Sequence, residues 1–123
     1  MGSPMTNPKI PEVNNVYGHI QAPQGLNVIL HAVTPVVGEQ RAFVHVSQFN
    51  GDEILRFASD VAEFESIPLE EPSRHLLNGC VAGSLDEVVA FVRALSGQLA
   101  QAAVEHRFEV YDSDQQLIQQ LPR

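Results

Sequence analysis

Apolar and polar residues alternate in the first part of the chain, a pattern typical of β-strands. Residues 41–49 show it most clearly, because every second residue from Ala42 to Val46 is apolar. Residues 16–20 alternate in the same way, and residues 26–33 form a run rich in Val, Ile and Leu. Turn-forming Pro and Gly residues separate the three stretches, so we predict three consecutive antiparallel strands.

Two later stretches repeat apolar residues at the spacing of an α-helix. Residues 51–64 follow Asn50, which can cap a helix, and Glu53 stands where it would complete a capping box. Residues 84–102 begin with a Ser-x-x-Glu capping box and continue with an apolar stripe. Each stretch is therefore predicted to be an amphipathic helix.

Three further strands complete the predicted fold. Residues 74–82 are apolar at both odd and even positions, as expected of a central strand that is buried on both faces. Residues 107–111 and 116–121 flank an Asp-Ser-Asp turn and are typical of a closing hairpin. The element order βββαβαββ predicts a two-layer α+β fold, in which an antiparallel sheet of about six strands has two helices packed on one face.

Length and composition fit one globular domain. The chain has 123 residues, of which 44% are hydrophobic, and this is enough to form a core without disulfides or metals. Residues 1–12 are rich in proline and lack periodicity, so we expect a disordered tail that begins with a cloning remnant. The globular domain is expected to span residues 13–123.

Register arguments place several polar and aromatic side chains on one face of the predicted sheet. The first two turns are expected to centre on Gln24 and Gly38, which fixes the residues that lie opposite each other. Tyr17 then faces His31, and His31 faces His45. Even-numbered positions of the three strands are apolar and are expected to face the core. The other face is predicted to carry Tyr17, His19, Asn27, Ile29, His31, Phe43, His45 and Ser47.

This polar and aromatic face is the main functional candidate in the sequence. Aromatic side chains are enriched in the cores of protein interfaces. We therefore expect a small acidic interaction domain that acts by binding rather than by catalysis, through contact with a protein partner or through self-association. The predicted contact residues are Tyr17, His19, His31, Phe43, His45 and Ser47. A half-exposed sheet face without any ligand, or one covered by the N-terminal tail, is the alternative that residue types alone leave open.

A small metal- or ligand-dependent enzyme is the second hypothesis. Neutral imidazoles bind zinc, copper or nickel, so His19, His31 and His45 on one face could hold such an ion. The carboxylates that usually orient histidine ligands are missing from these strands. Acid–base catalysis by His31 or His45, with Tyr17 as proton donor, is a further alternative. The sequence contains no phosphate-binding fingerprint such as G-x-G-x-x-G, and no cofactor is expected.

The balance of charges is strongly acidic, with 15 Asp and Glu against 7 Lys and Arg and a formal net charge of −8. Binding to nucleic-acid phosphates needs Lys and Arg, so we expect no nucleic-acid partner. About half of the acidic residues fall between positions 52 and 71, where a basic protein partner could bind. The predicted acidic surface comprises Asp60, Glu63, Glu65, Glu70 and Glu71.

The number of cysteines and the length of the apolar runs indicate in which cellular compartment the protein is expected. Cys80 is the only cysteine, which excludes an internal disulfide and fits a reducing compartment. Cys80 and His75 lie five positions apart on one predicted strand, so they face opposite sides and form no nucleophile pair. No apolar run approaches the ~20 residues of a membrane helix, and no signal peptide is visible. We expect a bacterial cytoplasmic domain without a membrane partner.

Overall fold

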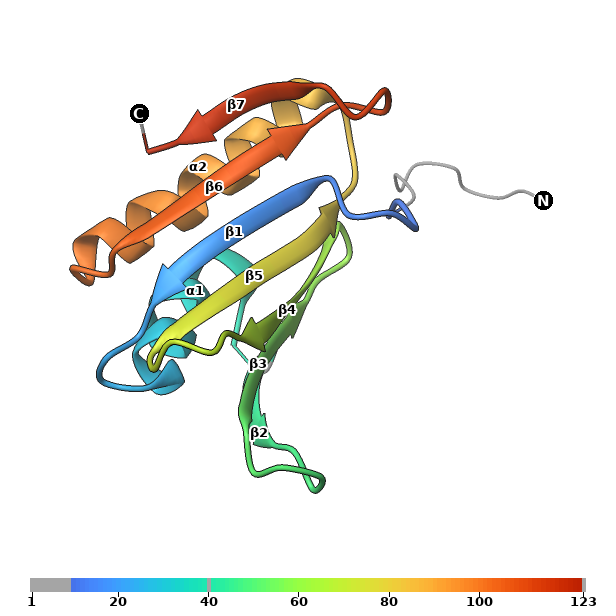
Figure 1. Ribbon diagram of the computed structural model, residues 1–123. Coiled ribbons are helices and arrows are strands. Elements are labelled where there is room, and N and C mark those ends of the chain that lie inside the picture. Colours follow the sequence, from blue (N-terminus) through green and yellow to red (C-terminus); the bar gives the residue numbers. More distant parts are fainter. Residues whose placement is uncertain (1–9, 40, 123) are drawn as a thin grey trace.

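The fold is a seven-stranded antiparallel sheet with two helices packed on one of its faces (Figure 1). The computed structural model describes residues 10–39 and 41–122, so most of the expected N-terminal tail lies outside the described residues. The predicted two-layer α+β class is confirmed. The elements are β1 (Val16–Gln21), α1 (Leu26–Val37), β2 (Ala42–Val46), β3 (Glu53–Ala58), β4 (Ala62–Pro68), β5 (Arg74–Val81), α2 (Leu85–Gln101), β6 (His106–Tyr111) and β7 (Leu117–Leu121).

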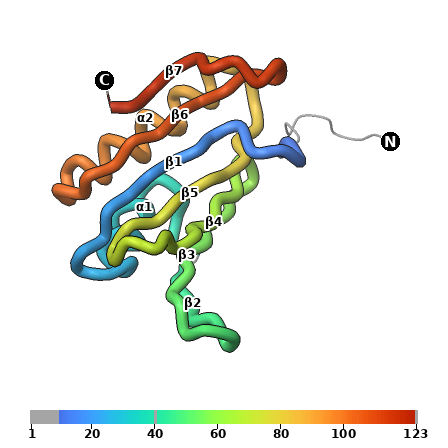
Figure 2. The backbone as a smooth tube through the Cα atoms, in the orientation of Figure 1, coloured from blue at the N-terminus to red at the C-terminus, as the bar shows by residue number. Residues whose placement is uncertain are grey.

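The strands lie in the order β2-β3-β4-β5-β1-β6-β7, and every neighbouring pair is antiparallel. The strand predicted at residues 74–82 is β5, and it occupies the centre of the sheet as expected. The first strand, β1, is inserted between β5 and β6, so segments far apart in sequence lie side by side (Figure 2). The β2–β3 hairpin extends beyond the rest of the sheet at its lower end (Figures 1 and 2).

The predicted strand at residues 26–33 is wrong, because this segment forms helix α1. A short run of Leu, Val and Ile fits a buried strand and a buried helix equally well. The decisive pattern is the helical spacing of the buried residues Leu26, Ile29, Val33 and Val37. Glycines with positive φ angles stand directly before and after the helix and separate it from the neighbouring strands.

The predicted helix at residues 51–64 is also wrong, because this segment forms β3, a turn and the start of β4. The buried residues Leu55 and Phe57 alternate with exposed ones at the strand period of two. Asn50 caps no helix. Its Oδ1 accepts a hydrogen bond of 3.0 Å from the Asp52 N–H in the turn after β2. The observed order is therefore βαββββαββ rather than βββαβαββ, with one strand more than the predicted six.

Helix α2 begins with the predicted capping box. The Glu87 N–H donates to the Ser84 hydroxyl at 3.2 Å, and the Ser84 N–H donates to Glu87 Oε1 at 2.8 Å. The two bonds satisfy backbone donors that otherwise lack a partner at a helix start. The predicted closing hairpin is likewise present as β6 and β7.

Close contacts between phenylalanine rings and glycines shape the core beneath the helices. Phe64 lies opposite Gly79 on neighbouring strands, and Phe108 lies opposite Gly18. A Cβ atom added at Gly18 would lie 2.6 Å from the Phe108 ring, and one added at Gly79 would overlap the Phe64 ring. Phe64 also stacks on Phe57, with ring centroids 4.9 Å apart. Each ring therefore occupies the space that a side chain would otherwise fill.

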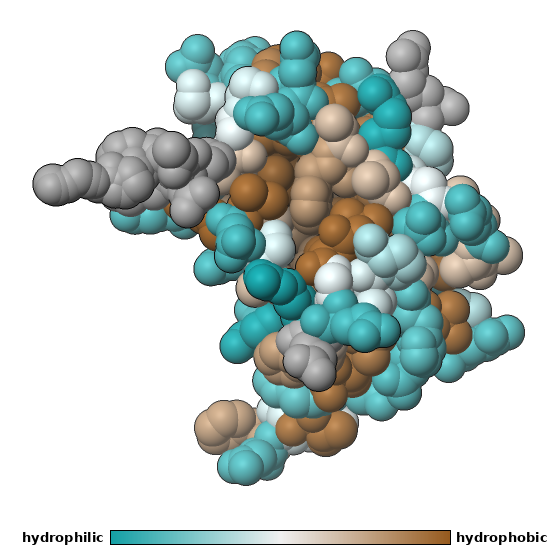
Figure 3. Space-filling view, turned by 180° about the vertical axis from the view of Figure 1, so that it is seen from behind, coloured by the Kyte–Doolittle hydropathy of each residue, from teal (hydrophilic) through white to brown (hydrophobic). Residues whose placement is uncertain are grey.

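Both helices cover the same face of the sheet. From the helix side, apolar side chains gather in the centre of the molecule and polar ones surround them (Figure 3). Hydrophobic residues that are only partly buried pack there against the core, among them Val28, Leu30, Val36, Val89 and Phe91. No helix of the described residues lies over the opposite face of the sheet (Figure 1).

We expect Gly79→Ala to destabilise the fold by about 1–3 kcal/mol, because the new methyl group would displace the Phe64 ring. Gly97→Ala is the matched control. Gly97 lies in α2, and a Cβ added there meets no atom within 4 Å. The control should stabilise the helix by about 0.5–1 kcal/mol. Urea unfolding of both variants measures the two free energies, and equal effects would contradict the packing described here.

Candidate functional site

The sheet face opposite the helices, called the open face below, carries polar and apolar side chains from all the central strands. The strand pairing identifies the side chains on this face, because along each strand they alternate with the side chains that face the core. One row of neighbours crosses the sheet from strand to strand. It consists of Phe43, Arg56, Glu65, Asn78, Tyr17, Glu109 and Gln120.

Four of the six predicted contact residues lie on the open face, but they form two separate groups. Tyr17 and His19 lie on β1, whereas Phe43 and His45 lie on β2. Strands β3, β4 and β5 separate β1 from β2. At about 4.8 Å per strand, the two groups are about 19 Å apart. The prediction of one continuous row of neighbours is therefore wrong, although these four residues do lie on the same face.

The other two predicted contact residues do not extend this surface. His31 lies on helix α1, in the layer that packs against the opposite side of the sheet. Ile29, predicted beside it, is fully buried in the core. Ser47 follows β2, and its hydroxyl accepts a hydrogen bond of 3.2 Å from the Phe49 N–H, so it shapes the hairpin turn. The misassigned strand at residues 26–33 caused the error for His31.

The structure does not bring the three candidate metal ligands together. His19 and His45 lie on strands that are not neighbours, and His31 lies in the helical layer. Within residues 10–39 and 41–122, no cluster of three or more His, Cys, Asp or Glu side chains has the geometry to hold a metal ion. The alternative of a metal-dependent enzyme built on these histidines therefore loses its geometric basis.

The predicted acidic surface is divided between the open face and the turns at either end of β4. Glu63 and Glu65 lie on the open-face side of β4, and Glu65 forms a salt bridge with Arg56. Asp60 lies 3.6 Å from Arg41, and Glu71 lies 3.7 Å from Arg74. Glu70 lies beside Glu71 in the turn after β4 and is exposed. Three of these five carboxylates are therefore partly neutralised by neighbouring arginines.

A trough runs across the open face from β6 to β3. It consists of three adjoining hollows with volumes of ≈ 430, ≈ 380 and ≈ 480 Å³. His19 lines both the first and the second hollow, and Asn78 lines both the second and the third. The shared residues show that the hollows adjoin each other, so the trough spans the five strands β6, β1, β5, β4 and β3.

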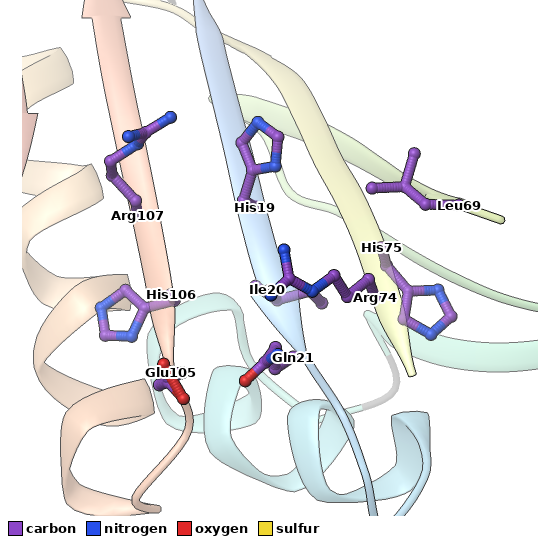
Figure 4. A pocket seen from close by; sticks show the side chains of 9 residues that line it. All are labelled: His19, Ile20, Gln21, Leu69, Arg74, His75, Glu105, His106 and Arg107. Carbon is purple, nitrogen blue, oxygen red and sulfur yellow. The ribbon is translucent and has the colours of Figure 1, made fainter. Parts of the chain in front are cut away.

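Two basic side chains lie together at the β6 end of the trough. His19 on β1 is the direct neighbour of Arg107 on β6, and both side chains stand on the open face (Figure 4). His106 points instead toward α2, where its Nε2 lies 2.7 Å from the Ser96 hydroxyl. Among the residues that the structure describes, Arg107 forms no salt bridge, unlike Arg56 and Arg74.

Sequence reasoning missed the residues that β5 and β6 contribute to the trough. Leu76, Asn78, Arg107 and Glu109 are far from β1 in sequence and join it only through strand pairing. The alternation within residues 107–111 was the available signal, because it separates Arg107 and Glu109 from the buried Phe108. That alternation does not say which strand lies beside β6.

Cys80 and His75 lie on opposite faces of β5, as the sequence predicted. Burial and the neighbouring Glu63 carboxylate raise the pKa of the Cys80 thiol, and its Sγ donates a hydrogen bond of 3.2 Å to Asn14 Oδ1. The thiol is therefore protonated and weakly nucleophilic near neutral pH. A hydrogen bond to Glu109 raises the pKa of Tyr111, and burial raises it by a smaller amount. Neither group has the lowered pKa of an activated nucleophile.

Comparisons with protein families, with curated proteins and with solved structures find no match to this chain. None of the helices in the described part of the chain has the length and apolar character needed to cross a membrane. Function must therefore be inferred from the site itself.

Burial lowers the pKa of His75, and this outweighs the opposite effects of Glu53 and Asp52. Its Nδ1 is buried without a hydrogen-bond partner among the described residues. The unfolded chain therefore binds a proton more readily than the folded chain. Stability should fall as the pH drops from about 6.5 toward the lowered pKa of His75.

We expect His75→Gln to lose less stability than the wild type between about pH 7 and pH 5, because it lacks this titrating group. Urea unfolding at both pH values measures the difference. His31→Gln makes the same exchange at an exposed histidine on α1 and should keep the wild-type pH dependence. An identical pH dependence for His75→Gln and the wild type would show that His75 has no such role.

Proposed function

We propose that this chain is a non-catalytic interaction domain whose open face binds an apolar segment of a protein partner that carries a carboxylate. The single observation that supports this proposal is the trough across β6, β1, β5, β4 and β3, with Arg107 at one end. The trough spans four strand spacings, or about 19 Å, which is the length of roughly six extended residues.

Apolar side chains along the trough favour a protein segment over a small polar ligand. Leu76 lies on its floor, next to His19 on the neighbouring strand. Ile67 and Leu69 at its sides keep 47% and 37% of their surface exposed. Covering these side chains would contribute roughly 25 cal/mol for each Å² of apolar surface removed from water.

The charges along the trough favour a partner that is acidic at the β6 end. Arg56 and Arg74 already form salt bridges with carboxylates, whereas Arg107 forms none among the described residues. A guanidinium binds a carboxylate through two parallel hydrogen bonds, which fixes orientation as well as charge. His19 beside Arg107 would supply a further donor. The carboxylate of the partner would therefore lie over these two residues.

Binding is favoured over catalysis by the geometry of the candidate residues. His19, His31 and His45 are dispersed over two layers and two distant strands. The Cys80 thiol has a raised pKa rather than the lowered pKa of a nucleophile. We further propose the cytoplasm as the compartment, because the chain has a single cysteine and so no internal disulfide.

The proposal can be tested with two fluorescent synthetic peptides of equal length, one of Leu, Ser and Glu and one of Leu, Ser and Lys. We expect the acidic peptide to bind and to shift the NMR signals of β1, β5 and β6 amides. The net charge of −8 would by itself favour the basic peptide, so preference for the acidic one must come from a local basic site. Fluorescence anisotropy measures the affinities.

Arg107→Glu should weaken binding of the acidic peptide at least about tenfold, because a hydrogen bond between charged groups is replaced by repulsion. Arg93→Glu on the exposed side of α2 makes the same charge change on the opposite layer and should leave the affinity unchanged. Equal losses in both variants, or signal shifts confined to the helices, would refute binding at the open face.

A further inference from the structure

Strand β2 forms one edge of the sheet and lacks the features that usually protect an edge. Its sequence, Ala-Phe-Val-His-Val, contains no charged residue and no proline. Charged side chains, prolines and bulges normally prevent edge strands from pairing with other chains. The other edge differs, because β7 is followed by Pro122 and its pairing with β6 shifts register at Val110 and Tyr111.

Backbone hydrogen bonds show which groups of β2 remain available at this edge. The Ala58 N–H donates to the Arg41 carbonyl at 3.0 Å, and the Ser47 N–H donates to the Asp52 carbonyl at 2.8 Å. Hydrogen-bonded pairs alternate along an antiparallel ladder, so Phe43 and His45 also direct their backbone groups toward β3. The N–H and C=O groups that point outward, away from β3, therefore belong to Ala42, Val44 and Val46.

The outer half of the β2–β3 hairpin has little support from the sheet. Strand β3 pairs with β4 only over Arg56 to Ala58, and the Leu55 N–H donates to the Ser66 hydroxyl of β4 at 2.8 Å instead of to a backbone carbonyl. The hairpin consequently projects from the body (Figure 1). An isolated two-stranded hairpin is marginally stable in water, so an additional strand along β2 would stabilise it.

From these observations we infer that two copies of this chain pair through β2, antiparallel and centred on Val44. In this register, Val44 lies opposite Val44 of the second copy, and Ala42 lies opposite Val46. The outward backbone groups of both strands then form about six hydrogen bonds. The two sheets become one continuous sheet with a two-fold axis at its centre.

The side chains of β2 complement themselves in this register. On the helix side, Val46, now 60% exposed, packs against Ala42 of the second copy. On the open face, Phe43, now 49% exposed, meets His45 of the second copy, and this aromatic pair occurs twice. Each copy carries a net charge of −8, but β2 itself carries none, so the contact brings no like charges directly together.

The same axis would place the two open faces side by side on one surface. The dimer would then offer two copies of the trough to a partner, which would increase avidity for a partner that carries two binding segments. The inference of pairing through β2 does not depend on the proposed binding at the trough, because the two surfaces share no residue of β2.

The decisive measurement is amide hydrogen exchange by NMR at low and high protein concentration. The amides of Ala42, Val44 and Val46 should exchange rapidly in the dilute chain and at least about tenfold more slowly in the concentrated chain. The amides of Phe43 and His45 should be protected at both concentrations. Sedimentation of the same samples should show a shift toward twice the mass of 13.5 kDa.

Two variants complete the experiment. Val46→Pro removes an outward N–H and no bond to β3, so the fold should persist by circular dichroism while the dimer is lost. Phe49→Ser removes a side chain that is 98% exposed at the hairpin tip and outside the paired register, so it should still form the dimer. A chain that remains monomeric at about 1 mM would overturn the inference. Rapid exchange of the outward amides in a dimer, or protection of β7 in larger assemblies, would also overturn it.

Discussion

The packing of Phe64 and Phe108 over Gly79 and Gly18 is the contact on which the layered structure depends. Both glycines lie on the helix side of the two central strands, where any larger side chain would collide with an aromatic ring. The rings replace the missing side chains and fill the space beneath the helices. Phe64 also lies between Phe57 and Phe91, with centroid distances of 4.9 and 6.2 Å, and so links β3 and α2.

A single core of this kind leaves one face of the sheet uncovered by the two described helices. Two helices can cover one side of seven strands, and both lie on the side of the phenylalanine rings. Among the described residues no helix covers the opposite side, and its trough collects residues from five strands. The edge strand β2 is left uncovered for a related reason, because the β2–β3 hairpin extends past the strands that could support it. The two candidate interaction surfaces are thus consequences of the same architecture.

The parts of the fold that local chemistry specifies were predictable. The Ser84 capping box located the start of α2, and the hairpin of β6 and β7 and the central β5 were located from their own patterns. The errors arose where a short apolar run suits two structures. Residues 26–33 fit a strand or a helix, and Ile54, Phe57 and Phe64 happen to fit a helical spacing although they lie on strands. Tertiary packing decided the structure of both segments, because contacts with the helix layer or with neighbouring strands outweigh the local preference of each residue.

The sequence by itself determined the α+β class, the acidic charge, the open-face positions of Tyr17 and His19 on β1, and the uncharged character of β2. These follow from residue type and the period of two, which act over a few neighbouring residues. Only the tertiary structure decided that β1 lies between β5 and β6, that Arg107 stands beside His19, and that His31 lies in the other layer. Strand order depends on contacts between residues far apart in the chain, and no local pattern encodes which strands meet.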